Sequence, residues 1–140
     1  MIQTLFNNIQ LWFGKLGDDF QLCFVKNDRW RYLLDGLGVT IEVALAAIVI
    51  GLLIGFLVAI IRSSHDKYGR FAALNALSKV YLTIIRGTPM VVQLLICYFI
   101  IMQSLDKVTV AILAFGINSG AYQAEILRTG IMSIDPGQME

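Results

Sequence analysis

The sequence predicts an all-α fold, a polytopic bundle of membrane helices. Of 140 residues, 57% are hydrophobic and 15% are charged, whereas about 25% of the residues in ordinary soluble domains are charged. The mean hydropathy is +0.71, and three long stretches nearly free of charge approach the length of a membrane crossing. This composition excludes a disordered chain and a nucleic-acid-binding protein. The net charge of +1 indicates no polyanionic or polycationic partner.

Residues that could carry chemistry are scarce. Cys23 and Cys97 stand 74 positions apart, and His65 is the single histidine. No metal-ligand spacing, nucleophile-base set or phosphate-binding loop accompanies them. We therefore expect no catalytic residue, no metal site and no cofactor, and any energy for work should come from another subunit.

Residues 1–34 are predicted to form an extracytoplasmic or interfacial N-terminal segment. Its first apolar residues recur at helical spacing, opposite a row of polar side chains, which is typical of a helix lying in the membrane interface. A helix packed on its own protein is the alternative. The apolar positions are Ile2, Leu5, Phe6, Ile9, Trp12 and Phe13.

The first predicted span covers residues 39–61. Its stretch from Val43 to Ile61 has 19 residues without a charge, about 28 Å of helix. Residues 62–70 are rich in charge and are expected to form a short polar loop.

The next apolar region, residues 71–105, is too long for one crossing and contains a predicted helix break. Gly87 suits a left-handed position after a helix, Thr88 an N-cap and Pro89 the first position of a new helix. Together with Arg86 these residues form the expected break, so the second span should cover residues 89–105. The helix before the break should have one polar face, made of Asn75, Lys79, Thr83 and Arg86.

The third predicted span, residues 108–128, carries a polar stripe. Asn118, Tyr122, Glu125 and Thr129 recur at spacings of one helical turn, which favours a bundle interior or an aqueous cavity over lipid. Glu125 can also pair with Arg128 one turn later.

Small residues at every fourth position predict close helix packing in the first and third spans. These positions are Gly51, Gly55, Ala59, Gly116, Gly120 and Ala124.

Another helix is expected to begin at residue 136, because Asp135 and Pro136 suit the N-cap and the first helical position. Since that helix could not bury its apolar face here, we expect the chain to be a fragment of a longer protein. The distribution of Lys and Arg narrowly favours a cytoplasmic 62–70 loop and C-terminus, with the N-terminus outside.

Two charged residues have more than one interpretation. Glu42, at the start of the first span, is favoured there by the helix dipole, but it could also meet a cationic substrate group. Arg86 could extend to the interface, or it could belong to a broken helix whose free amides engage a ligand. A proline kink without any ligand is a further alternative.

Two motifs resemble the permease subunits of polar amino-acid ABC importers. Residues 86–94 are similar to the family's R-G-T-P-x-x-V-Q-L signature, and residues 121–140 are similar to its A-Y-x-A-E-x-x-R-x-G-I run up to the start of the E-A-A segment. Gly36, Thr40 and Glu42 also resemble the family's first span. The resemblance covers about residues 32–140.

The resemblance implies that residues 35–140 are the N-terminal part of a permease domain that normally has five spans. It implies a cytoplasmic coupling helix that binds an ABC ATP-binding subunit, and here Gly137, Gln138 and Glu140 would begin that surface. The further partners implied are an extracytoplasmic amino-acid-binding protein, a second permease subunit in a homo- or heterodimer, and membrane lipid.

The predicted function is that of a non-enzymatic permease subunit of an ATP-driven importer, which moves a polar amino acid across the cell membrane by alternating access. The alternatives are a non-transporting membrane scaffold or regulatory subunit, and a passive channel. The candidate pathway residues are Glu42, Thr88, Gln93, Asn118, Tyr122 and Glu125.

Overall fold

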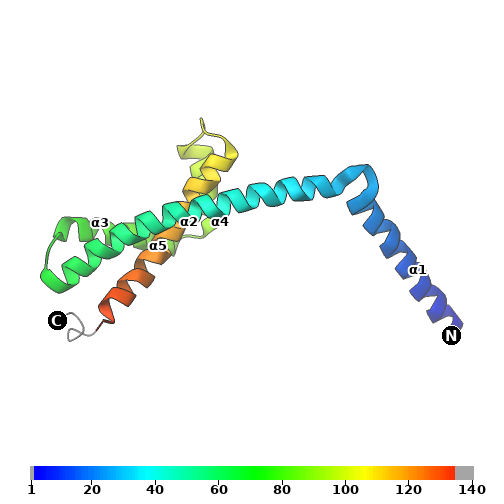
Figure 1. Ribbon diagram of the computed structural model, residues 1–140, viewed down its shortest axis with the longest axis horizontal. Helices are drawn as coiled ribbons and strands as arrows, with labels where there is room; N and C mark the ends of the chain where they lie inside the picture. The colour runs from blue at the N-terminus through cyan, green and yellow to red at the C-terminus, as the bar shows by residue number, and fades with distance from the viewer. Residues whose placement is uncertain (1, 135–140) are drawn as a thin grey trace. The chain divides into compact units, whose positions relative to one another are not determined.

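The fold is entirely helical over residues 2–134, the part of the chain that the computed structural model describes (Figure 1). This confirms the predicted fold class. The chain divides into two units, Met1–Thr40 and Ile41–Glu140. The elements in order are α1 (Ile2–Phe20), the π-helical turn η1 (Gln21–Val25), the 3₁₀ turn η2 (Lys26–Asp28), α2 (Arg29–Tyr68), α3 (Ala72–Gly87), α4 (Met90–Ile96), the π-helical turn η3 (Cys97–Ile101) and α5 (Lys107–Met132).

The first unit contains α1, both turns after it and the beginning of α2. On α1, the residues Trp12 and Phe13 are more than 60% exposed within the chain. Phe20 stacks on Phe24 with ring centroids 4.8 Å apart. Asp28, with φ at 53°, takes a left-handed conformation immediately before α2 begins. Asp is among the residues that tolerate this conformation best, and such a position lets the chain change direction between two helices.

Within residues 2–134, two helices, α2 and α5, are long and apolar enough to cross a bilayer. The pair formed by α3 and by α4 with η3 bends by 107°, and it makes a third candidate if it is taken as one broken span. The 12 helical residues from Met90 to Ile101 rise about 18 Å, against a hydrocarbon core of about 30 Å. The helix after the break therefore ends short of the predicted boundary at residue 105.

The prediction of a polar loop at residues 62–70 is wrong for most of these residues, because α2 continues to Tyr68. Arg62 and Asp66, two charged residues of this stretch, lie one helical turn apart and have ionic partners on α5. The chain reverses just afterwards. Gly69, with φ at +66°, and Phe71, with φ at 59°, are both left-handed, and the Gly69 amide donates to the carbonyl of His65 at 2.9 Å.

The core of the second unit lies where α2, α3 and α5 meet, and alanines are prominent in it. Leu82, Ala121 and Ala124 are buried, and Val58 and Tyr81 are among the side chains packed around them. The larger apolar side chains point outward, as expected for a surface solvated by lipid. Leu53, Leu57, Val91 and Ile126 are all more than 60% exposed.

Gly51 and Gly55 of α2 and Gly116 and Gly120 of α5 lie where the two helices touch. A Cβ on Gly55 would lie 2.9 Å from the Cβ of Gln123 and 3.1 Å from the amide nitrogen of Ala124. A Cβ on Gly116 would lie 2.7 Å from Cγ2 of Ile50. The same close approach holds for Gly51 against Ser119 and for Gly120 against Ile54. Ala59 and Ala124 are likewise buried in this contact region.

Candidate functional site

The site begins at the break between α3 and α4. Thr88 is extended, with φ at −116° and ψ at 143°, and Pro89 follows with φ at −61° and ψ at 136°. Proline disfavours helical angles in the residue before it and cannot donate an amide hydrogen bond. These two properties account for the end of α3 at Gly87 and for a new helix that begins at Met90.

The local roles expected at this break differ from those in the structure. Gly87 is the last helical residue and has no positive φ, whereas Thr88 is the C-cap of α3. The Thr88 hydroxyl donates back to the carbonyl of Ile84 at 2.8 Å instead of capping the next helix. Pro89 occupies the N-cap position of α4, one place earlier than expected. The hydroxyl is drawn backwards because the last carbonyls of α3 lack helical partners.

Gln93 fills the inside of the bend. Its amide nitrogen donates to the carbonyl of Ile85 at 2.6 Å, to the carbonyl of Thr88 at 3.0 Å and to the Thr88 hydroxyl at 2.8 Å. Its amide oxygen accepts from Asn118 on α5 at 3.1 Å. One side chain therefore satisfies carbonyls that the break leaves free and ties the bend to α5.

A second polar group surrounds Glu125 on α5. Arg62 on α2 donates to its carboxylate at 2.6 Å and Arg128 donates at 3.0 Å, while Arg86 at the end of α3 lies 3.8 Å away. Arg128 also pairs with Asp66 on α2 at 2.9 Å. A single carboxylate thus joins the ends of three helices through charge-assisted contacts.

An open groove of about 690 Å³ lies beside this carboxylate. The guanidinium of Arg86 lies 5.6 Å from the centre of the Tyr122 ring along it, within the range of a cation–π interaction. The groove is lined by Arg62, Lys79, Leu82, Thr83, Arg86, Gly87, Tyr122 and Glu125.

The structure brings five of the six candidate pathway residues into two groups. Thr88, Gln93 and Asn118 form the hydrogen-bonded group at the break, and Tyr122 and Glu125 line the groove. Glu42, the sixth candidate, is exposed on α2 and belongs to neither group. Gly137, Gln138 and Glu140 lie outside the described residues, as does the helix expected from residue 136.

Sequence reasoning missed Arg62 and Asp66 as partners of α5. Both were placed in a loop, although their spacing of four residues equals one turn of a continuing helix. Glu125 and Arg128 have the complementary charges at a spacing of three. This match between two helices is the signal that could have identified the ion pairs.

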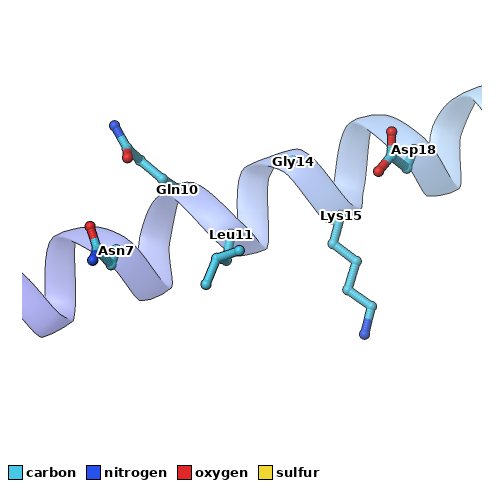
Figure 2. Close-up of a pocket in the computed structure, with 6 residues that line it drawn as sticks. All are labelled: Asn7, Gln10, Leu11, Gly14, Lys15 and Asp18. Carbon is cyan, nitrogen blue, oxygen red and sulfur yellow. The ribbon is translucent and has the colours of Figure 1, made fainter.

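A depression along α1 has none of these features. Figure 2 shows its six lining residues along a single helix, namely Asn7, Gln10, Leu11, Gly14, Lys15 and Asp18. It is a gap between side chains of one helix, without a second wall. Within residues 2–134, no group of three His, Cys, Asp or Glu side chains could hold a metal ion.

Comparison with known proteins identifies the family, although no protein-family model matches the chain. A glutamine transport system permease protein of Rickettsia prowazekii, described as putative, is 35% identical over 113 residues. An arginine transport system permease protein of Bacillus subtilis is also 35% identical over 113 residues, and an L-cystine permease protein of the same organism is 32% identical over 128. These matches cover 78%, 78% and 89% of this chain.

A solved structure agrees with these matches. The crystal structure of an amino acid ABC transporter with histidines superposes with a TM-score of 0.60 at 32% identity, over 76% of this chain and 52% of that one. The chain belongs to the permease family of polar amino-acid ABC transporters. It is therefore a multi-pass membrane protein. This permease chain spans about half the length of the curated relatives it matches, from 49% to 53%.

Proposed function

We propose that this chain forms part of the permease subunit of an ATP-driven importer that moves a polar amino acid across the cell membrane. The observation that carries the proposal is the hydrogen-bonded group at the break of the bent helix pair, together with the family membership. A broken helix at membrane depth leaves carbonyl and amide groups that need partners, and transporters use such breaks in their substrate pathways. The relatives are permeases for glutamine, arginine and cystine, all polar amino acids.

The transport step is alternating access around a central pathway. The hydroxyl and amide groups of Thr88, Gln93 and Asn118 now satisfy one another at 2.8–3.1 Å. During transport these groups would exchange one another for the polar groups of a passing amino acid. Tyr122 and Glu125 would continue the pathway beside the groove. Glu42, exposed on α2, would meet a cationic group at an entrance.

The permease forms and breaks no covalent bond, so ATP hydrolysis would take place in a separate ABC ATP-binding subunit. Residues Gly137, Gln138 and Glu140 would begin the surface that contacts this subunit. An extracytoplasmic binding protein would deliver the amino acid, and a second permease subunit would complete the pathway. The 62–70 region and the C-terminus would face the cytoplasm, with the N-terminus outside.

The first test is uptake of radiolabelled glutamine, arginine and cystine by proteoliposomes that contain the permease with its ATP-binding subunit and binding protein. We expect uptake that depends on internal ATP. Replacing Gln93 and Asn118 together by leucine should reduce the uptake rate at least tenfold, because the pathway loses its amide groups. The matched control is Gln103→Leu, since Gln103 is exposed and contacts the carbonyl of Phe99 within its own segment. This control should transport normally.

The alternative functions give different results. Uptake that continues without ATP would indicate a passive channel. A tagged chain that co-purifies with neither an ATP-binding subunit nor a binding protein would indicate a scaffold or regulatory subunit. Full uptake after alanine replacement of all six candidate residues would remove their assignment to the pathway.

A further inference from the structure

The groove beside Glu125 contains more positive than negative charge. Arg62, Lys79 and Arg86 line it together with one carboxylate. That carboxylate is already held by Arg62 and by Arg128, at 2.6 and 3.0 Å. Arg86 is 3.8 Å from it, with 42% of its side chain exposed. Lys79 makes no ion pair with any residue of the described chain. Two cations therefore face the groove without full neutralisation.

These two cations share one face of α3. Lys79, Thr83 and Arg86 are spaced by four and three residues, so an ammonium, a hydroxyl and a guanidinium lie in line along the groove. All three groups donate hydrogen bonds, and together they suit an oxyanion. Phosphate oxygens are well matched to such a set, since arginine binds them in a bidentate manner.

The opposite face of α3 is apolar and exposed. Leu77 is 66% exposed, and Val80 and Ile84 are 54% and 56% exposed. A helix with basic residues on one face and bare aliphatic side chains on the other is typical of the membrane interface. The groove also lies beside Arg62, the first charged residue after the apolar stretch of α2, which is the level at which headgroups are expected.

We propose that this groove binds the phosphate of an acidic phospholipid headgroup. Lys79, Thr83 and Arg86 donate to the phosphate oxygens, and Tyr122 forms a side of the site. The exposed aliphatic face of α3 contacts the acyl chains. A volume of about 690 Å³ leaves room for the glycerol group beyond the phosphate. Basic pockets between helices at the cytoplasmic surface are a known setting for anionic lipid headgroups.

The lipid site goes beyond the proposed transport function. Its donors Lys79 and Thr83 are separate from the hydrogen-bonded group at the break, whereas Arg86 belongs to the break motif and Tyr122 is shared with the proposed pathway. Bound lipid would add negative charge next to Arg86, which also approaches Glu125. The lipid therefore neutralises the end of α3, where the helix breaks.

The site can be tested by native mass spectrometry of the full chain, released from detergent micelles that contain equal amounts of phosphatidylglycerol and phosphatidylcholine. We expect the first bound lipid to be phosphatidylglycerol. Lys79→Gln should weaken its apparent affinity about fivefold, the contribution of one basic residue near an anionic surface. Lys79→Arg should restore it, and Thr83→Val should weaken it by a smaller factor. Lys107→Gln, at the other end of α5, is the matched control and should bind normally.

Several results would overturn the proposal. One is equal retention of the two lipids, and another is an equal loss of affinity in Lys79→Gln and Lys107→Gln. Displacement of phosphatidylglycerol by inorganic phosphate would assign the site to a free anion. Displacement by glutamine or arginine would assign it to the carboxylate of a transported amino acid. Circular dichroism of each variant distinguishes loss of binding from loss of helix.

Discussion

Glu125 on α5 forms ion pairs that link α5 to α2 and α3. Replacing it by glutamine keeps the size of the side chain but removes the charge that Arg62, Arg86 and Arg128 share. The side chain of Arg62 is 15% exposed, so water can only partly replace its lost partner. We expect Glu125→Gln to lower the free energy of unfolding by about 2 kcal/mol, as for other hydrogen bonds to charged groups. Denaturant unfolding of the detergent-solubilised chain measures this change.

The arginines provide the internal comparison. Arg62→Gln should cost nearly as much as Glu125→Gln, because it removes the contact at 2.6 Å. Arg86→Gln should cost least, since its contact is 3.8 Å long and its side chain is 42% exposed. The opposite order would show that the short contact does not hold α2 to α5.

Asp106 is the N-cap residue of α5 and lies before the apolar part of that helix. Hydrogen bonds from Thr109, one of them from its amide at 3.0 Å, lower the pKa of the Asp106 carboxyl below its usual value. A carboxyl with a lowered folded-state pKa stabilises the fold fully above its unfolded pKa of about 3.9. That contribution is lost as the pH falls through the folded-state pKa. We therefore expect the Thr109 amide to lose hydrogen-exchange protection in acid.

The variant Asp106→Asn separates capping from titration. Its amide oxygen still accepts from the Thr109 amide but does not titrate in this range. Protection factors at Thr109, measured by hydrogen exchange, should then stay constant over the acid range in which the wild type loses them. An acid loss of the same size in both proteins would contradict this role of the carboxylate.

At the scale of helices, the contact between α2 and α5 depends on the absence of side chains. Gly55→Ala would place a methyl group 2.9 Å from Gln123 and 3.1 Å from the backbone of Ala124. Because backbone cannot move aside easily, we expect a loss of about 1–3 kcal/mol. The matched control is Gly36→Ala on the same helix, which meets no described atom within 4 Å. It should be neutral or stabilising by up to about 1 kcal/mol. Thermal unfolding in detergent measures both variants.

The sequence predicts helices better than it predicts where they end. Hydropathy reports where lipid contact stops, and for α2 that is near Ile61. The helix nevertheless continues to Tyr68, because Arg62 and Asp66 find partners on α5. Those partners are more than 60 residues away along the chain, so a local pattern could not have shown that the polar stretch stays helical.

The candidate site was predictable in its residues but less so in their contacts. The sequence located the break through Pro89, since proline restricts its own backbone angles and those of the preceding residue, Thr88. The bend of 107° and the donation from Gln93 to Ile85 and Thr88 depend on how α4 turns back toward α3 and α5. The grouping of Asn118 with Gln93 likewise needs the packing of α5 against α4, since the two residues are 25 positions apart in sequence.

At the scale of the whole molecule, the orientation in the membrane decides which solution each site faces. The two ends of the bundle carry equal numbers of basic residues in their short connections, and Lys79 and Arg86 on α3 narrowly favour the end that includes Arg62 and Arg128. Short cytoplasmic loops carry such an excess of Lys and Arg. The groove, the ion pairs around Glu125 and the start of the expected coupling helix would then share the cytoplasmic side.

The native cysteines allow this orientation to be measured. Cys23 is exposed in the N-terminal segment, so we expect a membrane-impermeant maleimide to label it in intact cells. The Cys23→Ser variant should lose this labelling, which identifies the modified residue. In that background, Lys67→Cys places a thiol at the exposed end of α2. It should react in inside-out vesicles and stay unmodified in intact cells. The reverse pattern at both positions would place the basic end of the bundle outside, where it could not meet an ATP-binding subunit, and would thereby contradict the proposed import mechanism.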